Sequence, residues 1–175
     1  MRYVEHRRHS IRVQPGQHLS QAGVDLARRV GNGMGPFQRV VTSPAPRAFE
    51  TAIAMGFAVD DLLPDELSMT PDGMGAEIDW AANFAEYQRV AEQGGITSRF
   101  AQQLAEYHRA LAASVPEGER ALIISHGGIV EASAIGCLSG FDYSAWGPSC
   151  SYCEGIRLHF DGQRFVHADL LRVPA

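Results

Sequence analysis

Four basic or imidazole side chains lie at or just after the ends of segments that are predicted to be strands: Arg8, His9, Arg47 and His126. Arginine offers a planar, permanently charged fork that suits a phosphoryl dianion. A neutral histidine can attack phosphorus, and a second histidine can donate a hydrogen bond to a phosphoryl oxygen. These residue types are the parts of a covalent phosphoryl transfer, provided that the fold brings them together.

The first of these stretches is crowded with positive charge. Arg7, Arg8 and Arg12 surround His9 within six residues, and such cations repel one another unless an anion balances them. The stretch is therefore either a solvated basic edge or half of a phosphate site. Glu5 shares a strand face with Arg7, so we expect this buried pair to have polar partners or partial exposure.

Alternating strand and helix patterns predict the frame that positions these side chains. Strands are predicted over residues 2–8, 39–42, 59–63 and 121–125, with two more at 156–160 and 165–171. Helices are predicted over residues 21–30, 46–55 and 129–138, with two more that begin at Asp79 and Thr97. Ser20 is a typical N-cap, Pro46 a typical first helical residue, and Asp161-Gly162 a two-residue hairpin turn.

Two aromatic stripes on the predicted helices are interpreted as core. They are Trp80, Phe84, Tyr87 and Ala91 on the first helix, and Phe100, Leu104, Tyr107 and Leu111 on the second. The segment 67–76 between strand and helix is rich in Met, Gly and Pro and is predicted to be a loop.

This order of elements predicts a single three-layer α/β domain over residues 1–175. The central sheet is mostly parallel, with helices on both faces and an antiparallel C-terminal hairpin. In such sheets the ligand site lies at the carboxyl ends of the strands. All four basic and imidazole side chains are predicted at that edge.

Composition narrows the class of partner. The net charge of −5 argues against a nucleic-acid or membrane partner, and no apolar run is long enough to span a bilayer. The first residues contain no apolar core typical of a signal peptide. Three cysteines imply no disulfide framework, and Cys150 and Cys153 are interpreted as buried or idle thiols rather than as a redox pair or half of a zinc site. We therefore expect a cytoplasmic protein.

Four motifs in order make the resemblance to a known family. Arg8-His9-Ser10 is similar to the Arg-His-Gly that opens the family's sequences, and residues 19–27 are similar to the helix-start pattern L-T-x-x-G-x-x-x-A. The segment TSPAPRAFETA (42–52) is similar to S-S-P-x-x-R-A-x-x-T-A, and residues 125–128 match S-H-G-G. The chain resembles the histidine phosphatase superfamily, the phosphoglycerate mutase-like group. The resemblance implies that His9 accepts the phosphoryl group and that Arg8, Arg47 and His126 hold its oxygens. Ser10 and Gly127 are expected at the same substrate site, without a metal or a cofactor.

The general acid is the role that the motifs assign least directly. Met69 stands where many members of the family have the glutamate of an L-x-E motif. Glu77 is the favoured replacement, because a loop with two glycines could carry it over the pocket mouth. Glu77 could instead have a structural role, because an acidic residue in the first turn of a helix interacts favourably with the helix dipole. Glu66 and Asp72 are the alternatives.

The predicted function is a phosphomonoester hydrolase that acts on a phosphorylated small molecule or phosphoprotein. The alternative is a weak or inactive relative that binds phosphate or a phosphorylated partner, because Ser10 replaces glycine and the L-x-E glutamate is missing. A mutase is disfavoured because the chain is short. A serine hydrolase would need a G-x-S-x-G elbow, which the sequence lacks.

Overall fold

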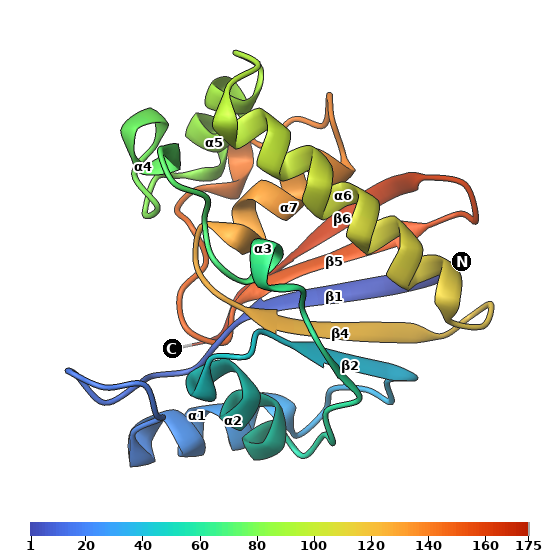
Figure 1. Ribbon diagram of the computed structural model, residues 1–175. Coiled ribbons are helices and arrows are strands. Elements are labelled where there is room, and N and C mark those ends of the chain that lie inside the picture. Colours follow the sequence, from blue (N-terminus) through green and yellow to red (C-terminus); the bar gives the residue numbers. More distant parts are fainter. Residues whose placement is uncertain (175) are drawn as a thin grey trace.

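A six-stranded mixed sheet forms the centre of the computed structural model, which describes residues 1–174 (Figure 1). The strands lie in the order β3-β2-β4-β1-β5-β6. Their bounds are β1 Arg2–Arg8, β2 Arg39–Thr42, β3 Asp61–Leu62, β4 Arg120–Ser125, β5 Gly155–Phe160 and β6 Phe165–Leu171. Neighbours from β3 to β1 are parallel, and β5 and β6 add an antiparallel edge. The predicted fold class is confirmed.

Helices cover both faces of this sheet. They are α1 Gln21–Gly31, α2 Pro46–Met55, α3 Asp65–Ser68, α4 Met74–Glu77, α5 Phe84–Ala91, α6 Ile96–Ser114 and α7 Ile129–Cys137, with a short 3-10 helix, Ser144–Trp146. Alternate side chains of β4 point to opposite faces of the sheet and contact different helical layers. Ile123 packs in the cluster that contains α5, α6 and α7, whereas Leu122 and Ile124 pack with α1 and α2. The result is the predicted three-layer arrangement.

Local sequence signals set several element ends as expected. The Ser20 side chain accepts a hydrogen bond from the backbone N–H of Gly23 at 3.1 Å, which caps α1. Pro46 is the first residue of α2, and Gly56 ends this helix with a φ of 98°. Strands β1 and β2 have the predicted bounds.

The helix predicted from Asp79 was placed too early. Its N-cap is Asn83, whose side chain accepts the N–H of Glu86 at 2.8 Å, so α5 begins at Phe84. Asp79 instead closes a local turn by accepting the N–H of Ala81. As a consequence Trp80 lies outside the helix and is 54% exposed, and its assignment to the core was wrong.

Three other local predictions also need correction. Strand β3 contains only two residues, and the predicted loop contains single helical turns at α3 and α4. The hairpin between β5 and β6 has a loop of four residues, 161–164, rather than a two-residue turn. The Asp161 carboxylate accepts the N–H groups of Gln163 and Arg164, both at 2.8 Å, which favours this longer loop.

Strand β1 carries polar side chains through the middle of the sheet, and Glu5, His6 and Arg7 all have partners there. The Glu5 carboxylate is 1% exposed and binds Arg7 at 2.7 Å and Arg157 at 3.1 Å. The neighbouring His6 is fully buried and lies between Ser125 and His108. The expectation of partners for Glu5 and Arg7 is confirmed.

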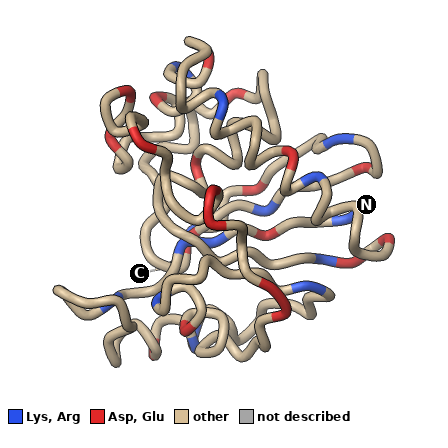
Figure 2. Tube along the Cα trace, viewed as in Figure 1, with Lys and Arg blue, Asp and Glu red and all other residues tan. Residues whose placement is uncertain are grey.

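Charge is unevenly distributed along the chain. Between Arg47 and Arg89 the sequence contains acidic residues but no basic residue. Figure 2 shows these acidic positions along the segment that runs from β3 through α3 to α4. The basic side chains at the strand ends therefore come from other parts of the chain.

Candidate active site

The parallel register brings the ends of three strands to one edge of the sheet. Arg8 pairs with Ser125, and Thr42 pairs with Ile124, so the residues that follow β1, β2 and β4 leave the sheet side by side. A cavity of about 430 Å³ opens there, within the range of small-molecule sites. Its lining is Arg8, His9, Arg12, Gln14, Arg47, Ser68, Met69, Thr70, Trp80, His126, Gly127, Ile129 and Tyr152.

His9 presents one unprotonated ring nitrogen to this cavity. Its Nδ1 lies 2.7 Å from the Ser10 carbonyl oxygen and must donate to it, because a carbonyl only accepts. Nε2 then carries the lone pair, and Arg47 Nε donates to it at 3.3 Å. Burial lowers the pKa of His9 to about 4, and the nearby charges of Arg47 and Arg8 act in the same direction. The imidazole is therefore neutral at pH 7 and can act as a nucleophile.

Arg8 is held between two aromatic rings. Its guanidinium carbon lies 4.5 Å from the ring centroid of Tyr152 and 5.3 Å from that of Trp80. One of its terminal nitrogens donates to the Cys150 carbonyl at 3.0 Å. Its Nε is buried and has no hydrogen-bond partner among the described residues. An anion in the cavity would supply that missing acceptor.

His126 has a similar unsatisfied group. Its Nε2 lies 2.8 Å from Ser43 Oγ, and that oxygen already accepts the N–H of Ala45 at 3.3 Å. The Ser43 hydroxyl can therefore donate to Nε2, which leaves the proton of the neutral ring on Nδ1. His126 Nδ1 is buried without a partner within the described chain. Burial and the nearby Arg47 lower the pKa of His126 to about 3, so the neutral form is the one present.

The remaining predicted arginine comes from the first turn of α2. Besides its bond to His9, Arg47 donates to the Gln17 side chain at 2.5 Å. The rings of His9 and His126 lie 5.3 Å apart between centroids. The structure thus brings together the four side chains that the sequence singled out: Arg8, His9, Arg47 and His126.

The two smaller residues expected at the site behave differently. Gly127 lines the cavity, and a Cβ there would lie 3.3 Å from the Trp80 ring and 3.5 Å from Arg8 Nε, so the position has little room for a side chain. Ser10 is fully buried, and its hydroxyl donates to the Gly23 carbonyl at 2.7 Å. The structure therefore does not bring the Ser10 side chain into the lining, and this side chain ties the His9 loop to α1 instead.

Glu77 is not brought to the cavity. One carboxylate oxygen accepts the N–H of Ile96 at 2.7 Å, and the other accepts the N–H and the hydroxyl of Thr97 at 2.8 and 2.7 Å. These bonds cap the start of α6 and lower the pKa of Glu77. Glu66 and Asp72 are exposed and also lie outside the lining. The geometry supports the capping reading of Glu77 rather than a role as general acid.

A buried carboxylate accepts two backbone N–H groups in the loops next to the cavity. Glu131 is fully buried, and its oxygens accept the N–H groups of Gly128 and Cys150, each at 2.7 Å. Because Cys150 also accepts from Arg8, this carboxylate connects the loop after β4 with the loop that holds Arg8. Burial raises the pKa of Glu131.

Sequence reasoning missed the aromatic and apolar wall of the cavity. Trp80 was assigned to the core, and Met69 and Tyr152 were given no role in substrate binding. Trp80 and Met69 are 54% and 61% exposed at the pocket. No local pattern marks a loop residue for such a position, because its placement depends on segments far apart in the chain.

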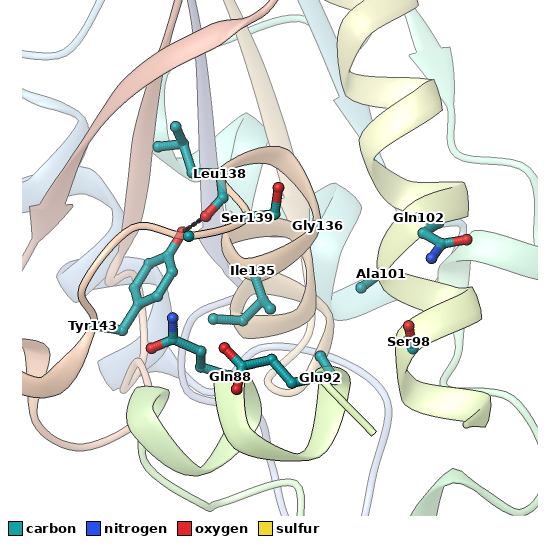
Figure 3. Close-up of a pocket in the computed structure, with 12 residues that line it drawn as sticks. Gln88, Glu92, Ser98, Ala101, Gln102, Ile135, Gly136, Leu138, Ser139 and Tyr143 are labelled. Atoms are coloured by element: carbon teal, nitrogen blue, oxygen red, sulfur yellow. Dashed lines mark hydrogen bonds between the residues drawn. The ribbon is translucent and has the colours of Figure 1, made fainter. Parts of the chain in front are cut away.

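A second pocket lies between α5, α6 and the end of α7 (Figure 3). The side chains that the figure labels are polar or apolar, with Glu92 as the one charged group among the described lining residues. A phosphate dianion requires cationic partners. The pocket at the strand ends is therefore the candidate active site.

The fold is an α/β sheet whose parallel strand ends carry two arginines and two histidines around one cavity. The family model for the histidine phosphatase superfamily (branch 1) matches residues 4–171. The chain belongs to the histidine phosphatase superfamily.

Solved structures with the same fold include two phosphatases and a mutase. Phosphoserine phosphatase from Entamoeba histolytica, in complex with 3-phosphoglyceric acid, has a TM-score of 0.69 at 17% identity and covers 99% of this chain and 98% of its own. A mycobacterial glucosyl-3-phosphoglycerate phosphatase in complex with VO3 has a TM-score of 0.66 at 18% identity, with 99% and 100% covered. Phosphoglycerate mutase from Thermus thermophilus has a TM-score of 0.59 at 16% identity, with 98% and 99% covered.

No curated protein matches the sequence significantly. In the part of the chain that the structure describes, none of the helices combines the length and the apolar character needed to cross a bilayer.

Proposed function

We propose that this protein is a phosphomonoester hydrolase that works through a phosphohistidine at His9. The observation that carries the proposal is the unprotonated Nε2 of a neutral His9, whose lone pair faces Arg47 Nε, in a cavity with unsatisfied donors. Arg8 Nε and His126 Nδ1 are both buried without partners within the described residues, and Arg47 lies 3.3 Å from the nucleophilic nitrogen. A bound phosphoryl group would give each of these donors an acceptor.

In the first step His9 Nε2 attacks phosphorus. The P–N bond forms as the bond from phosphorus to the ester oxygen breaks, and the electron pair of that bond leaves with the oxygen. The hydrogen bond from Nδ1 to the Ser10 carbonyl holds the ring and stabilises the positive charge that develops on it. Arg8, Arg47 and His126 stabilise the charge on the phosphoryl oxygens.

In the second step water attacks the phosphohistidine. The new bond joins the water oxygen to phosphorus, the P–N bond breaks, and its electron pair returns to Nε2. Inorganic phosphate then leaves, and the water proton is carried by phosphate and solvent. Hydrolysis in place of transfer to a second substrate distinguishes this scheme from that of a mutase.

The leaving oxygen needs a proton in the first step unless it departs as a stable anion. Among the described residues that line the cavity, none carries a carboxyl group. Since the Glu77 carboxylate already caps α6, the proton for the leaving oxygen comes from solvent in this scheme.

The relatives support a small substrate. The Entamoeba protein is a phosphoserine phosphatase and the mycobacterial protein a glucosyl-3-phosphoglycerate phosphatase, so both are named for small phosphorylated molecules. A cavity of about 430 Å³ suits a ligand of that size. We propose a phosphorylated small molecule as substrate, ahead of a phosphoprotein.

The three cysteines are free, which supports a reducing compartment such as the cytoplasm.

The test is turnover of a panel of phosphomonoesters by the wild type, by His9→Ala and by His18→Ala. His18 is an exposed imidazole paired with Glu50 outside the cavity lining, so its variant is the matched control. We expect phosphate release by the wild type and by His18→Ala, and loss of release by His9→Ala. An alkaline quench should retain labelled phosphate on the wild-type protein, whereas an acid quench should remove it.

Two outcomes would contradict the proposal. Turnover by His9→Ala at the wild-type rate would exclude the covalent scheme. Binding of inorganic phosphate by the wild type, without turnover of any ester in the panel, would select the alternative of a non-catalytic phosphate-binding relative.

A further inference from the structure

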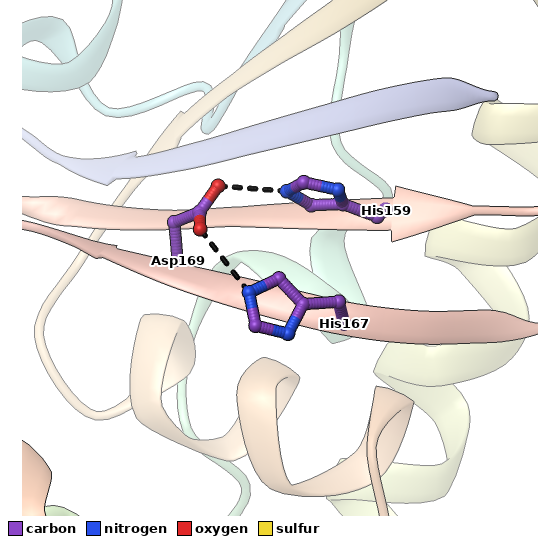
Figure 4. Close-up of side chains that lie close together, drawn as sticks. All are labelled: His159, His167 and Asp169. Atoms are coloured by element: carbon purple, nitrogen blue, oxygen red, sulfur yellow. Dashed lines mark hydrogen bonds and ion pairs between the residues drawn. The ribbon is translucent and has the colours of Figure 1, made fainter.

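Two histidines and an aspartate meet on the hairpin at the edge of the sheet (Figure 4). His159 on β5 lies directly opposite His167 on β6 in the antiparallel register, and Asp169 lies two residues further along β6. His159 Nε2 is 2.7 Å from one carboxylate oxygen of Asp169, and His167 Nε2 is 3.3 Å from the other. One carboxylate therefore lies between two imidazole nitrogens.

The spacing of these atoms is close to that of a metal site. One ligand atom from each side chain lies within 4.8 Å of the other two. Zinc binds imidazole and carboxylate at about 2.0 to 2.2 Å, so the ligand atoms of a tetrahedral site lie about 3.3 Å apart. The distances to Asp169 reach this value at one histidine and fall short of it at the other, so small side-chain rotations can bring all three ligand atoms around one ion.

Neighbouring rings pack against both histidines. The His159 ring packs edge-on against Tyr3 at 5.0 Å between centroids, and the His167 ring packs against Phe141 at 6.2 Å. Such support reduces the side-chain entropy that a ligand would otherwise have to overcome.

The cation that faces Asp169 across the hairpin does not occupy the carboxylate. Arg157 is the strand partner of Asp169, but its guanidinium binds Glu5 at 3.1 Å. Asp169 is left to the two histidines. The side chains of His159, His167 and Asp169 are 23%, 52% and 40% exposed, so an ion can reach them from solvent and can keep water as a further ligand.

We propose that His159, His167 and Asp169 bind a divalent transition-metal cation of the zinc type. Two imidazoles and one carboxylate form a donor set that suits zinc, nickel or copper and is a poor match for magnesium or calcium. The ion would connect β6, the edge strand, to β5 and thereby stabilise the hairpin. This site uses none of the residues of the proposed hydrolase, so the two proposals stand or fall separately.

The test is a calorimetric titration of the full chain with zinc chloride at pH 7.5. We expect one site with a dissociation constant in the micromolar range, and a rise in the thermal midpoint when zinc is added. His167→Ala and His159→Ala should each weaken binding at least tenfold and abolish the rise. Because His167 is half-exposed, its variant is expected to fold, and circular dichroism checks this.

Two controls test imidazoles elsewhere in the molecule. His18→Ala removes an exposed histidine that pairs with Glu50. His9→Ala removes one member of the imidazole pair in the candidate active site. Both variants should bind zinc as the wild type does. Absence of saturable binding by the wild type, unchanged affinity in His167→Ala and His159→Ala, or loss of the site in His9→Ala would each overturn the proposal.

Discussion

A buried pair of histidines makes the stability of this protein sensitive to acid. His108 Nδ1 lies 2.7 Å from the Leu104 carbonyl and must donate to it, so its Nε2 accepts from His6 Nδ1 at 3.0 Å. His6 Nε2 in turn accepts the Ser125 hydroxyl at 2.6 Å. This chain of hydrogen bonds is satisfied with both rings neutral. A proton added to either ring would place a positive charge in a fully buried position, which is the physical cause of the lowered pKa values.

The size of the effect follows from the pKa of His108. Burial lowers it from 6.5 to about 4. As the pH falls below about 6.5 the unfolded chain takes up a proton at this side chain, and the folded protein does so only near pH 4. The stability that the neutral His108 ring contributes above pH 6.5 is therefore lost as the pH falls from about 6.5 to about 4. At about 1.4 kcal/mol per pH unit, the loss for this one group is about 3 kcal/mol.

The measurement is urea unfolding of the wild type and of His108→Leu between pH 7.5 and 4. At pH 7.5 we expect the variant to be less stable, because His6 Nδ1 loses its acceptor. The difference in free energy of unfolding should shrink by about 3 kcal/mol as the pH falls to 4, since the variant no longer carries the titrating group. A difference that stays constant with pH would refute the reasoning. The His18→Ala variant, which removes an exposed ring, serves as the control.

Four further outcomes are expected. Arg47→Lys keeps a positive charge but loses the bond to His9, so kcat/KM should fall about tenfold or more with the fold intact, and unchanged turnover would remove Arg47 from the site. Glu77→Gln should lower the thermal midpoint and leave the ratio of alkyl to nitrophenyl phosphate turnover unchanged; a selective loss on alkyl esters would restore its role as acid. Glu131→Gln removes one of two buried acceptors and should cost about 2 kcal/mol in urea unfolding, and an unaltered unfolding midpoint would contradict this role. Because the pKa of His9 is about 4, the nucleophile should stay unprotonated down to about pH 5, and NMR titration of its ring with a midpoint near 6.5 would disagree.

Much of the frame is predictable because its signals are local. The cap at Ser20, the proline that starts α2 and the glycine that ends it act within a few residues, and these helix ends were predicted correctly. The aliphatic run of β4 also predicted a buried strand. The four basic and imidazole side chains were predicted to meet for a topological reason. Each lies at or after the end of a parallel strand, and parallel strands end at the same edge of the sheet.

The wall of the site and the role of several polar groups depended on contacts between distant segments. Glu77 was placed at the pocket mouth because its loop looked flexible, but 19 residues further along the chain the free N–H of Ile96 offers a nearer partner. Trp80 was assigned to the core because its spacing fits a helical stripe. The helix instead begins after the cap at Asn83, so Trp80 lies in the preceding loop, at the cavity beside Arg8. The sequence pattern reports which residues share a face, whereas the choice between competing hydrogen-bond partners is made only when tertiary packing brings those partners within reach.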